Sequence, residues 1–180
     1  MGFSISWIAI NGKSKEQVLD QLGLVETGIS DEANESPISG AELPGGWYLL
    51  FMNDIAHAFT EESALRNLSA SCTVLLCQVD EHVMASAALA YENGEGVWSV
   101  LHEAERGGRH LAENGVMPSI YNDIRTKLLS DQDEMDAEDE PVDCVWDIPV
   151  TLAYSICGYR HDNVYLKSGG TSSFTKIHAG

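Results

Sequence analysis

The sequence predicts an α+β fold, with a mostly antiparallel sheet and helices packed on one face of it. Three features of the chain lead to this class. Residues 72–102 have the pattern of three short strands joined by tight turns, a three-stranded antiparallel meander. Residues 3–10 and 46–52 are rich in β-branched and aromatic side chains, as strands are. Two helical patterns follow the last strand, an order that is typical of α+β proteins.

The turns of the meander are its clearest signal. Asn93 and Gly94 both tolerate a positive φ, so this pair predicts a two-residue hairpin turn. Asp80-Glu81 predicts the turn before it. Between the two turns, apolar residues alternate with others from Val83 to Tyr91, which places them on one face of a strand.

A first, short helix is predicted directly after the strand at 3–10. Ser14 and Gln17 have the spacing of a capping box, in which each side chain satisfies a backbone N–H at the helix start. Gly23 is a natural terminator, because glycine adopts the left-handed conformation at helix ends without strain. The segment 30–45 is rich in Ser, Asp, Glu, Asn, Pro and Gly and is predicted to be a surface loop.

Two more helices are predicted near the C-terminus. The first carries apolar residues four apart from Ile120 to Leu128, and this spacing gives a helix one apolar side. The second begins at Asp147 and ends at Gly158, which are typical helix-starting and helix-ending residues. The segment 103–117 before them is Gly-rich and polar and is predicted to be a connection.

The net charge is the most unusual property of the chain. There are 28 acidic residues against 10 basic ones, for a formal charge of −18. Proteins that bind nucleic acids or anionic membranes unaided gain affinity from cations placed on phosphates, so this charge argues against both partners. It favours a basic protein partner, divalent cations, or solubility alone.

Acidic residues are densest in the segment 130–143. Such a block repels itself, and we predict a mobile acidic loop between the two C-terminal helices. The alternative to a binding role is a solvated loop without a partner. If the block binds a basic partner, the contact residues are Asp131, Asp133, Glu134, Asp136, Glu138, Asp139 and Glu140.

The length of 180 residues is that of one ordinary domain. We place this domain at 1–165, and the small polar residues at 166–180 predict a flexible C-terminal tail. The start of the chain lacks the pattern of a secretory signal, and no apolar run is long enough to span a membrane. Together with four cysteines that are typical of buried reduced thiols, these features predict a cytoplasmic protein.

No catalytic, metal-binding or cofactor motif is complete. His102-Glu103 begins like a metalloprotease helix motif, but Arg106 stands where the second histidine ligand is needed. The acidic block fails as a calcium-binding loop, because Met135 occupies a ligand position and Val142 replaces the bidentate glutamate. We therefore assign no catalytic residue, no metal ligand and no cofactor.

Two alternatives to a binding protein stay open. One is an enzyme of hydrolase type with a site of distant histidines and a carboxylate, which would require its histidines to converge in a pocket. The other is an acidic mimic of nucleic acid, which would require rows of carboxylates on one rigid face. The candidate histidines are His82, His102, His110 and His161.

Several sequence blocks resemble a family of uncharacterised bacterial cytosolic proteins. The resemblance covers residues 3 to about 162 and implies one bacterial cytosolic domain, but it implies no activity and no functional residues. The blocks are Gly46-Trp-Tyr-Leu49, Glu81-His-Val-Met84, Val97-Trp-Ser-Val-Leu-His102 and Trp146-Asp-Ile-Pro149 with Gly158-Tyr-Arg-His-Asp162.

The size, the acidity and the lack of a catalytic motif also resemble those of small acidic immunity proteins. We therefore expect a non-catalytic interaction protein, such as an immunity protein or inhibitor that neutralises a basic toxin or effector. An acidic surface speeds association with a basic partner and can occupy its active-site cleft.

Overall fold

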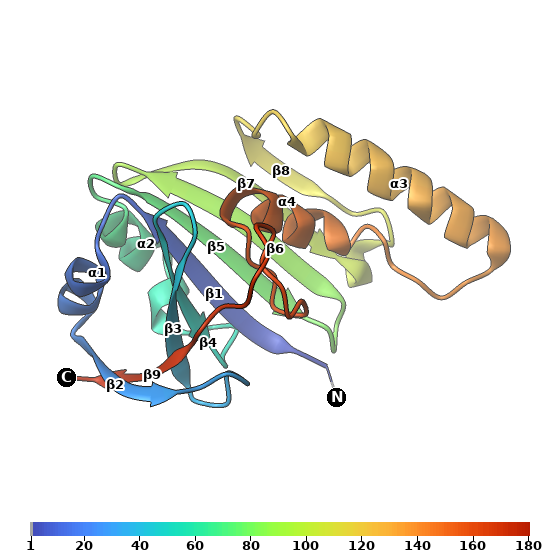
Figure 1. Cartoon of the computed structure of the whole chain (residues 1–180). Coiled ribbons are helices and arrows are strands. Elements are labelled where there is room, and N and C mark those ends of the chain that lie inside the picture. Colours follow the sequence, from blue (N-terminus) through green and yellow to red (C-terminus); the bar gives the residue numbers. More distant parts are fainter. Residues whose placement is uncertain (1) are drawn as a thin grey trace.

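The computed structural model describes residues 2–180, whose central element is a nine-stranded antiparallel sheet (Figure 1). The strands lie in the order β2-β9-β3-β4-β1-β5-β6-β7-β8. The α+β class and the antiparallel sheet predicted from the sequence are confirmed. The strand bounds are Ser4–Asn11 (β1), Leu24–Ser30 (β2), Ile38–Leu43 (β3), Trp47–Met52 (β4), Thr73–Asp80 (β5), Ala85–Glu92 (β6), Glu95–Glu103 (β7), Ala112–Gly115 (β8) and Thr175–Ala179 (β9).

The helices lie on both faces of the sheet, not on one face as predicted (Figure 1). Helices α1 and α2 cover one face, α4 covers the other, and α3 packs beside α4. Two short 3-10 turns span Ala58–Thr60 and Ala104–Arg106. The helix bounds are Lys15–Leu22 (α1), Glu62–Leu68 (α2), Tyr121–Glu138 (α3) and Asp147–Cys157 (α4).

The central strand β1 explains why both faces need a cover. Successive residues of a strand point to opposite faces, and β1 is apolar and buried at every position from Trp7 to Ile10. Trp7 belongs to the apolar cluster under α4, whereas Ile8 and Ile10 belong to the cluster under α1 and α2. A sheet that is apolar on both faces must bury both.

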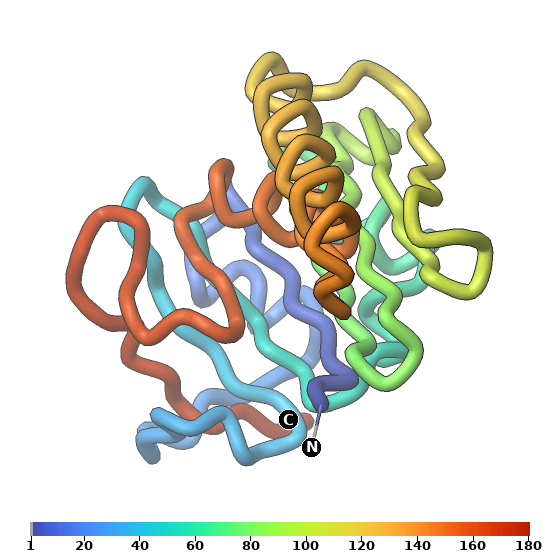
Figure 2. The backbone as a smooth tube through the Cα atoms, turned by 90° about the vertical axis from the view of Figure 1, so that its right-hand side faces the viewer, coloured from blue at the N-terminus to red at the C-terminus, as the bar shows by residue number. Residues whose placement is uncertain are grey.

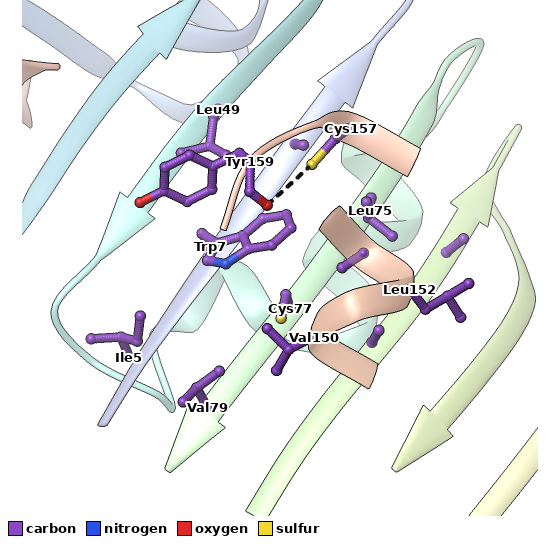
Figure 3. Packing of buried hydrophobic residues seen from close by; sticks show 14 of the residues in the cluster. Ile5, Trp7, Leu49, Leu75, Cys77, Val79, Val150, Leu152, Cys157 and Tyr159 are labelled. Atoms are coloured by element: carbon purple, nitrogen blue, oxygen red, sulfur yellow. Dashed lines mark hydrogen bonds between the residues drawn. The ribbon is translucent and has the colours of Figure 1, made fainter. Parts of the chain in front are cut away.

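The core under α4 is the larger of the two, and part of it is drawn in Figure 3. Val150 of α4 lies beside Cys77 of β5, and Leu152 of the same helix belongs to this apolar cluster. The rings of Trp7 and Tyr159 pack edge to face with centroids 5.5 Å apart, a favourable aromatic geometry. This packing holds α4 and the residues after it against the sheet.

The predicted meander is confirmed and is longer than expected. β5, β6 and β7 pair in sequence, and β8 adds a fourth strand. Asn93 and Gly94 form the hairpin turn with positive φ angles of 51° and 82°. β8 lies inside the segment 103–117, which was predicted to be a connection. Its four residues are all exposed, so it lacks the apolar alternation by which a strand is recognised.

The C-terminal segment is not the flexible tail that 166–180 predicted. Its last part forms β9, which lies between β2 and β3 and pairs with both. Gly40 of β3 leaves room for β9, because a Cβ at that position would clash with the Tyr48 hydroxyl and the Ile177 side chain. β3 itself falls in the segment 30–45 that was predicted to be a loop.

The prediction of an acidic loop at 130–143 is wrong for most of that segment. Helix α3 continues to Glu138, so five of the seven proposed contact residues lie on a helix: Asp131, Asp133, Glu134, Asp136 and Glu138. Asp139 ends the helix in the left-handed conformation with a φ of 57°. The N–H groups of Asp139 and Glu140 donate to the carbonyl oxygens of Asp136 and Met135. These bonds close the end of the helix in an ordered way.

Candidate functional site

Helix α3 lies at the periphery of the molecule, and its C-terminal end faces the viewer in Figure 2. One side of the helix packs inward through Ile124, Leu128 and Leu129, which contact the core under α4. The buried Gln132 anchors the last turns, because its amide accepts from the N–H of Cys144 and donates to the carbonyl of Val142. The acidic residues of α3 are thus held on an anchored helix.

Three of the proposed contact residues have partners within the chain. Asp131 pairs with Lys127 one turn earlier, and both Asp133 and Asp136 pair with Arg109, at 2.7 and 2.6 Å. A hydrogen bond from Gln132 and the nearby Arg109 guanidinium together lower the pKa of Asp136. All three carboxylates are partly neutralised, and Asp133 and Asp136 connect α3 to the segment before β8.

The other four carboxylates form what we call the acidic tip: Glu134, Glu138, Asp139 and Glu140. All four residues are exposed, and within residues 2–180 none has a hydrogen-bond or ion-pair partner for its side chain. No basic residue lies in the last turn of α3. The negative charge of the tip is therefore added to the negative end of the helix dipole, an unfavourable arrangement.

A buried ion pair fixes the segment that follows the acidic tip. His102 of β7 is fully buried, and its Nε2 lies 3.0 Å from an oxygen of Asp143. The second oxygen of Asp143 accepts from the N–H of Trp146 at 2.9 Å. The pair thus connects β7, next to the edge strand β8, to the start of α4, and we call it the His102–Asp143 clamp.

The geometry of the clamp specifies the charge of His102. The ring nitrogen Nδ1 lies 2.8 Å from the carbonyl oxygen of His110, while Nε2 faces the Asp143 carboxylate. Both neighbours only accept hydrogen bonds, so both ring nitrogens must carry a proton. His102 satisfies its two partners only as the imidazolium ion. Burial lowers the pKa of His102, but the bonds to Asp143 and His110 outweigh burial and raise it overall.

The four candidate histidines do not meet in one pocket. His102 and His110 are neighbours, but His102 bonds to the carbonyl oxygen of His110, whose ring instead accepts from the backbone N–H of Glu103. His82 lies in the exposed β5–β6 turn beside Asp80. His161 follows α4 and contacts the rings of Phe3 and Trp146. The convergence that a hydrolase site requires is not found among these side chains.

Within residues 2–180, no group of three or more His, Cys, Asp or Glu side chains is placed to hold a metal ion. The four cysteines are free thiols, and three of them are buried. Burial raises the pKa of Cys157 to about 12, which keeps this thiol protonated and unreactive.

Two residues that organise this region were not proposed as a pair from the sequence. Asp143 was one acid among many, and His102 was considered for metal binding or catalysis. A signal was present: His102 continues the inward-facing positions of Trp98 and Val100 along β7. That alternation marks His102 as a core residue in need of a polar partner, but it does not indicate which acid, 41 residues away, provides it.

Comparisons of this chain with protein-family models, with curated proteins and with solved structures found no match. The resemblance to uncharacterised bacterial cytosolic proteins therefore stays a prediction. Among the helices of residues 2–180, none combines the length and the apolar character needed to cross a membrane.

Proposed function

We propose that this protein is a non-catalytic binding protein of the bacterial cytosol that neutralises a basic toxin or effector, with the acidic tip as its contact surface. One observation carries the proposal. Four carboxylates without partners in the described chain are concentrated at the end of an anchored helix.

This arrangement is unfavourable for the isolated protein. The four carboxylates repel one another, and they lie where the helix dipole is already negative. A basic partner would relieve both effects at once. The gain in electrostatic energy on binding is then greater than for carboxylates that already have partners in the chain.

Order at the tip supports a binding role further. Because the backbone around Asp139 and Glu140 is hydrogen bonded in the free protein, little conformational entropy is lost when a partner binds. The remaining acidic surface of the chain, with its net charge of −18, would attract a basic partner over a longer range.

The test is affinity capture from a bacterial lysate with three forms of the protein as bait. The wild type is compared with an acidic-tip variant and with a control variant of the same net charge. The tip variant carries Glu134→Gln, Glu138→Gln, Asp139→Asn and Glu140→Gln. The control carries changes at four exposed acids elsewhere, namely Asp20→Asn, Glu61→Gln, Glu92→Gln and Glu105→Gln.

We expect a basic protein to be captured by the wild type and by the control but lost with the tip variant. Equal loss with both variants would show that net charge alone attracts the partner. Capture by all three would move the interface away from α3, and capture by none would contradict the proposal.

The helical order of α3 also favours a second candidate, the nucleic-acid mimic, because its carboxylates are held on a rigid element. A mimic competes directly with nucleic acid for its target. If duplex DNA displaces the captured partner from the bait in proportion to its concentration, the partner is a nucleic-acid-binding protein and the mimic is favoured. A partner that DNA does not displace favours the toxin inhibitor.

A further inference from the structure

A cleft of about 600 Å³ opens on the same side of the sheet as α4 and α3. It lies between the start of the chain, the loop after β2 and the loops that follow α4. Tyr159 and Phe174, which line its inner wall, belong to the core under α4. The other lining residues that matter here are Phe3, Glu32, Asn34, His161, Asp162 and Asn163.

The charged groups that line this cleft are carboxylates only; no lysine or arginine is among its lining residues. Glu32 is exposed, and its side chain has no partner within residues 2–180. Asp162 receives hydrogen bonds from Arg160 at 2.6 and 3.0 Å, so it is partly neutralised. The cleft therefore disfavours an anionic ligand and favours a cationic one.

His161 adds a second, independent observation at this cleft. Its side chain is fully buried, and although Nε2 lies 4.0 Å from a carboxylate oxygen of Glu81, neither ring nitrogen has a hydrogen-bond partner within residues 2–180. A buried polar group without a partner is costly. Burial lowers the pKa of His161, so the ring is neutral and offers one acceptor nitrogen.

Phe3 packs against this ring. The two rings meet edge to face with centroids 5.0 Å apart, and Phe3 itself is 41% exposed near the start of the chain. Binding of a ligand at the His161 ring requires the Phe3 side chain to turn outward, which would also leave an aromatic face at the rim of the cleft. A flat cation can stack on such a face.

We propose that the cleft binds the guanidinium group of an arginine side chain presented by the basic partner. A guanidinium has five N–H donors and no acceptor, which matches the carboxylate of Glu32 and the free nitrogen of His161. It also stacks on aromatic rings better than an ammonium group does. This inference rests on the proposed function for the source of the arginine, but binding of the side chain can be measured alone.

The test is an amide NMR titration of the full chain with the peptide acetyl-Gly-Arg-Gly-amide. The matching peptide with citrulline has nearly the same shape without the charge. We expect saturable shifts with the arginine peptide in the cleft segments 32–34, 161–163 and 171–174, and none with the citrulline peptide.

Two variants and one control locate the site. Glu32→Gln removes the free carboxylate, and His161→Phe keeps an aromatic ring without its nitrogens. We expect each to weaken binding about threefold, the effect of losing one modest polar contact. Glu35→Gln, three residues from Glu32 and outside the cleft lining, should leave the Kd unchanged.

The inference is overturned if the citrulline peptide shifts the same amides equally, or if the arginine peptide shifts only amides of α3. It is also overturned if the Glu32→Gln and His161→Phe variants both bind the arginine peptide as tightly as Glu35→Gln does. The acidic-tip variant separates this inference from the proposed function. If that variant keeps the cleft response, the cleft binds arginine independently of the tip. If the cleft response is absent while the tip-dependent partner is still captured, only the cleft inference fails.

Discussion

The two faces of the sheet are built by different means. On the side of α1 and α2, the ion pairs are half-buried or exposed: Lys15 and Glu26 are 25% and 26% exposed, and Arg66 and Glu62, one turn apart on α2, are 41% and 68% exposed. The side of α3 and α4 has exposed pairs too, but it also has a largely buried pair that joins distant segments: His102 is 0% and Asp143 18% exposed. Arg160, likewise 18% exposed, connects Asp147 at the start of α4 to Asp162 after its end.

This difference indicates which face is specialised. Surface pairs contribute little to stability, so the first face depends mainly on its apolar core. Buried pairs are costly to break and hold particular segments in place. The segments held on the second face are those that carry the acidic tip and the cleft. The face with the buried pairs is therefore the one on which we expect binding.

The largest expected loss of stability is at the C-terminal segment, which the two faces share. The C-terminal segment contributes Phe174 to the core under α4 and Ile177 to the core under α1 and α2. We expect Phe174→Ala to lower the free energy of unfolding by about 3–5 kcal/mol and Ile177→Ala by about 2–4 kcal/mol. Urea denaturation measures both, with the exposed His178→Ala as a control. Losses below about 1 kcal/mol would mean that the segment is a loose tail after all.

Breaking the His102–Asp143 clamp is expected to have the next largest effect. Asp143→Ala leaves the buried imidazolium without its counter-charge, so we expect a loss of about 3 kcal/mol in unfolding free energy. The surface pair on the other face provides the comparison, and Glu62→Ala should cost less than about 1 kcal/mol. Equal losses at the two sites would remove the contrast between the faces.

The clamp should also respond to pH in a defined direction. The raised pKa of His102 means that its contribution is complete below the unfolded value of 6.5 and is lost as the pH rises through the folded value. Burial opposes ionisation of Asp143, but its bonds to His102 and to the Trp146 N–H lower its pKa overall. Its contribution is therefore complete above 3.8 and is lost as the pH falls through the folded value.

We therefore expect Asp143→Asn to destabilise the protein most between pH 3.8 and 6.5, and less as the pH rises further. The measurement is the difference in unfolding free energy between wild type and variant at about pH 5.5 and about pH 9. Taking this difference cancels the opposite pH dependence of His161, whose pKa is lowered. A difference that grows with pH would contradict a charged His102.

A smaller effect of opposite sign is expected at the acidic tip. Neutralising its four carboxylates removes repulsion at the negative end of α3, so the melting temperature should rise by about 2–4 °C. The control variant with four neutral substitutions elsewhere should shift less. A lower melting temperature in the tip variant would mean that these carboxylates stabilise the fold, and would weaken the case that they serve binding.

The smallest expected effect lies on the other face. The Ser14 hydroxyl accepts from the N–H of Gln17, and the Gln17 side chain accepts from the N–H of Ser14, so the predicted capping box is present. We expect Ser14→Ala to lower the unfolding free energy by about 1 kcal/mol. Thermal melts at neutral pH measure this loss, and an unchanged stability would show that the cap contributes little to the fold.

The sequence by itself determined the features that depend on neighbouring residues. The capping box at Ser14, the turn at Asn93-Gly94 and the helix end at Gly158 are all found where the sequence predicted them. In each case the interaction spans only a few residues, so its signal is complete within a short stretch of chain. The alternating pattern of the meander is local in the same sense.

Only the tertiary structure decided the features that join distant residues. The polar strand β9 is positioned by its pairing with β2 and β3, and its own residues do not predict a strand. The acidic end of α3 is helical despite the repulsion between its carboxylates, because Gln132 anchors it to the segment before α4. The partner of His102 comes from another part of the chain, and the cleft is lined by several segments that are far apart in the sequence. Such contacts depend on how the chain packs as a whole, and no short stretch of sequence contains that information.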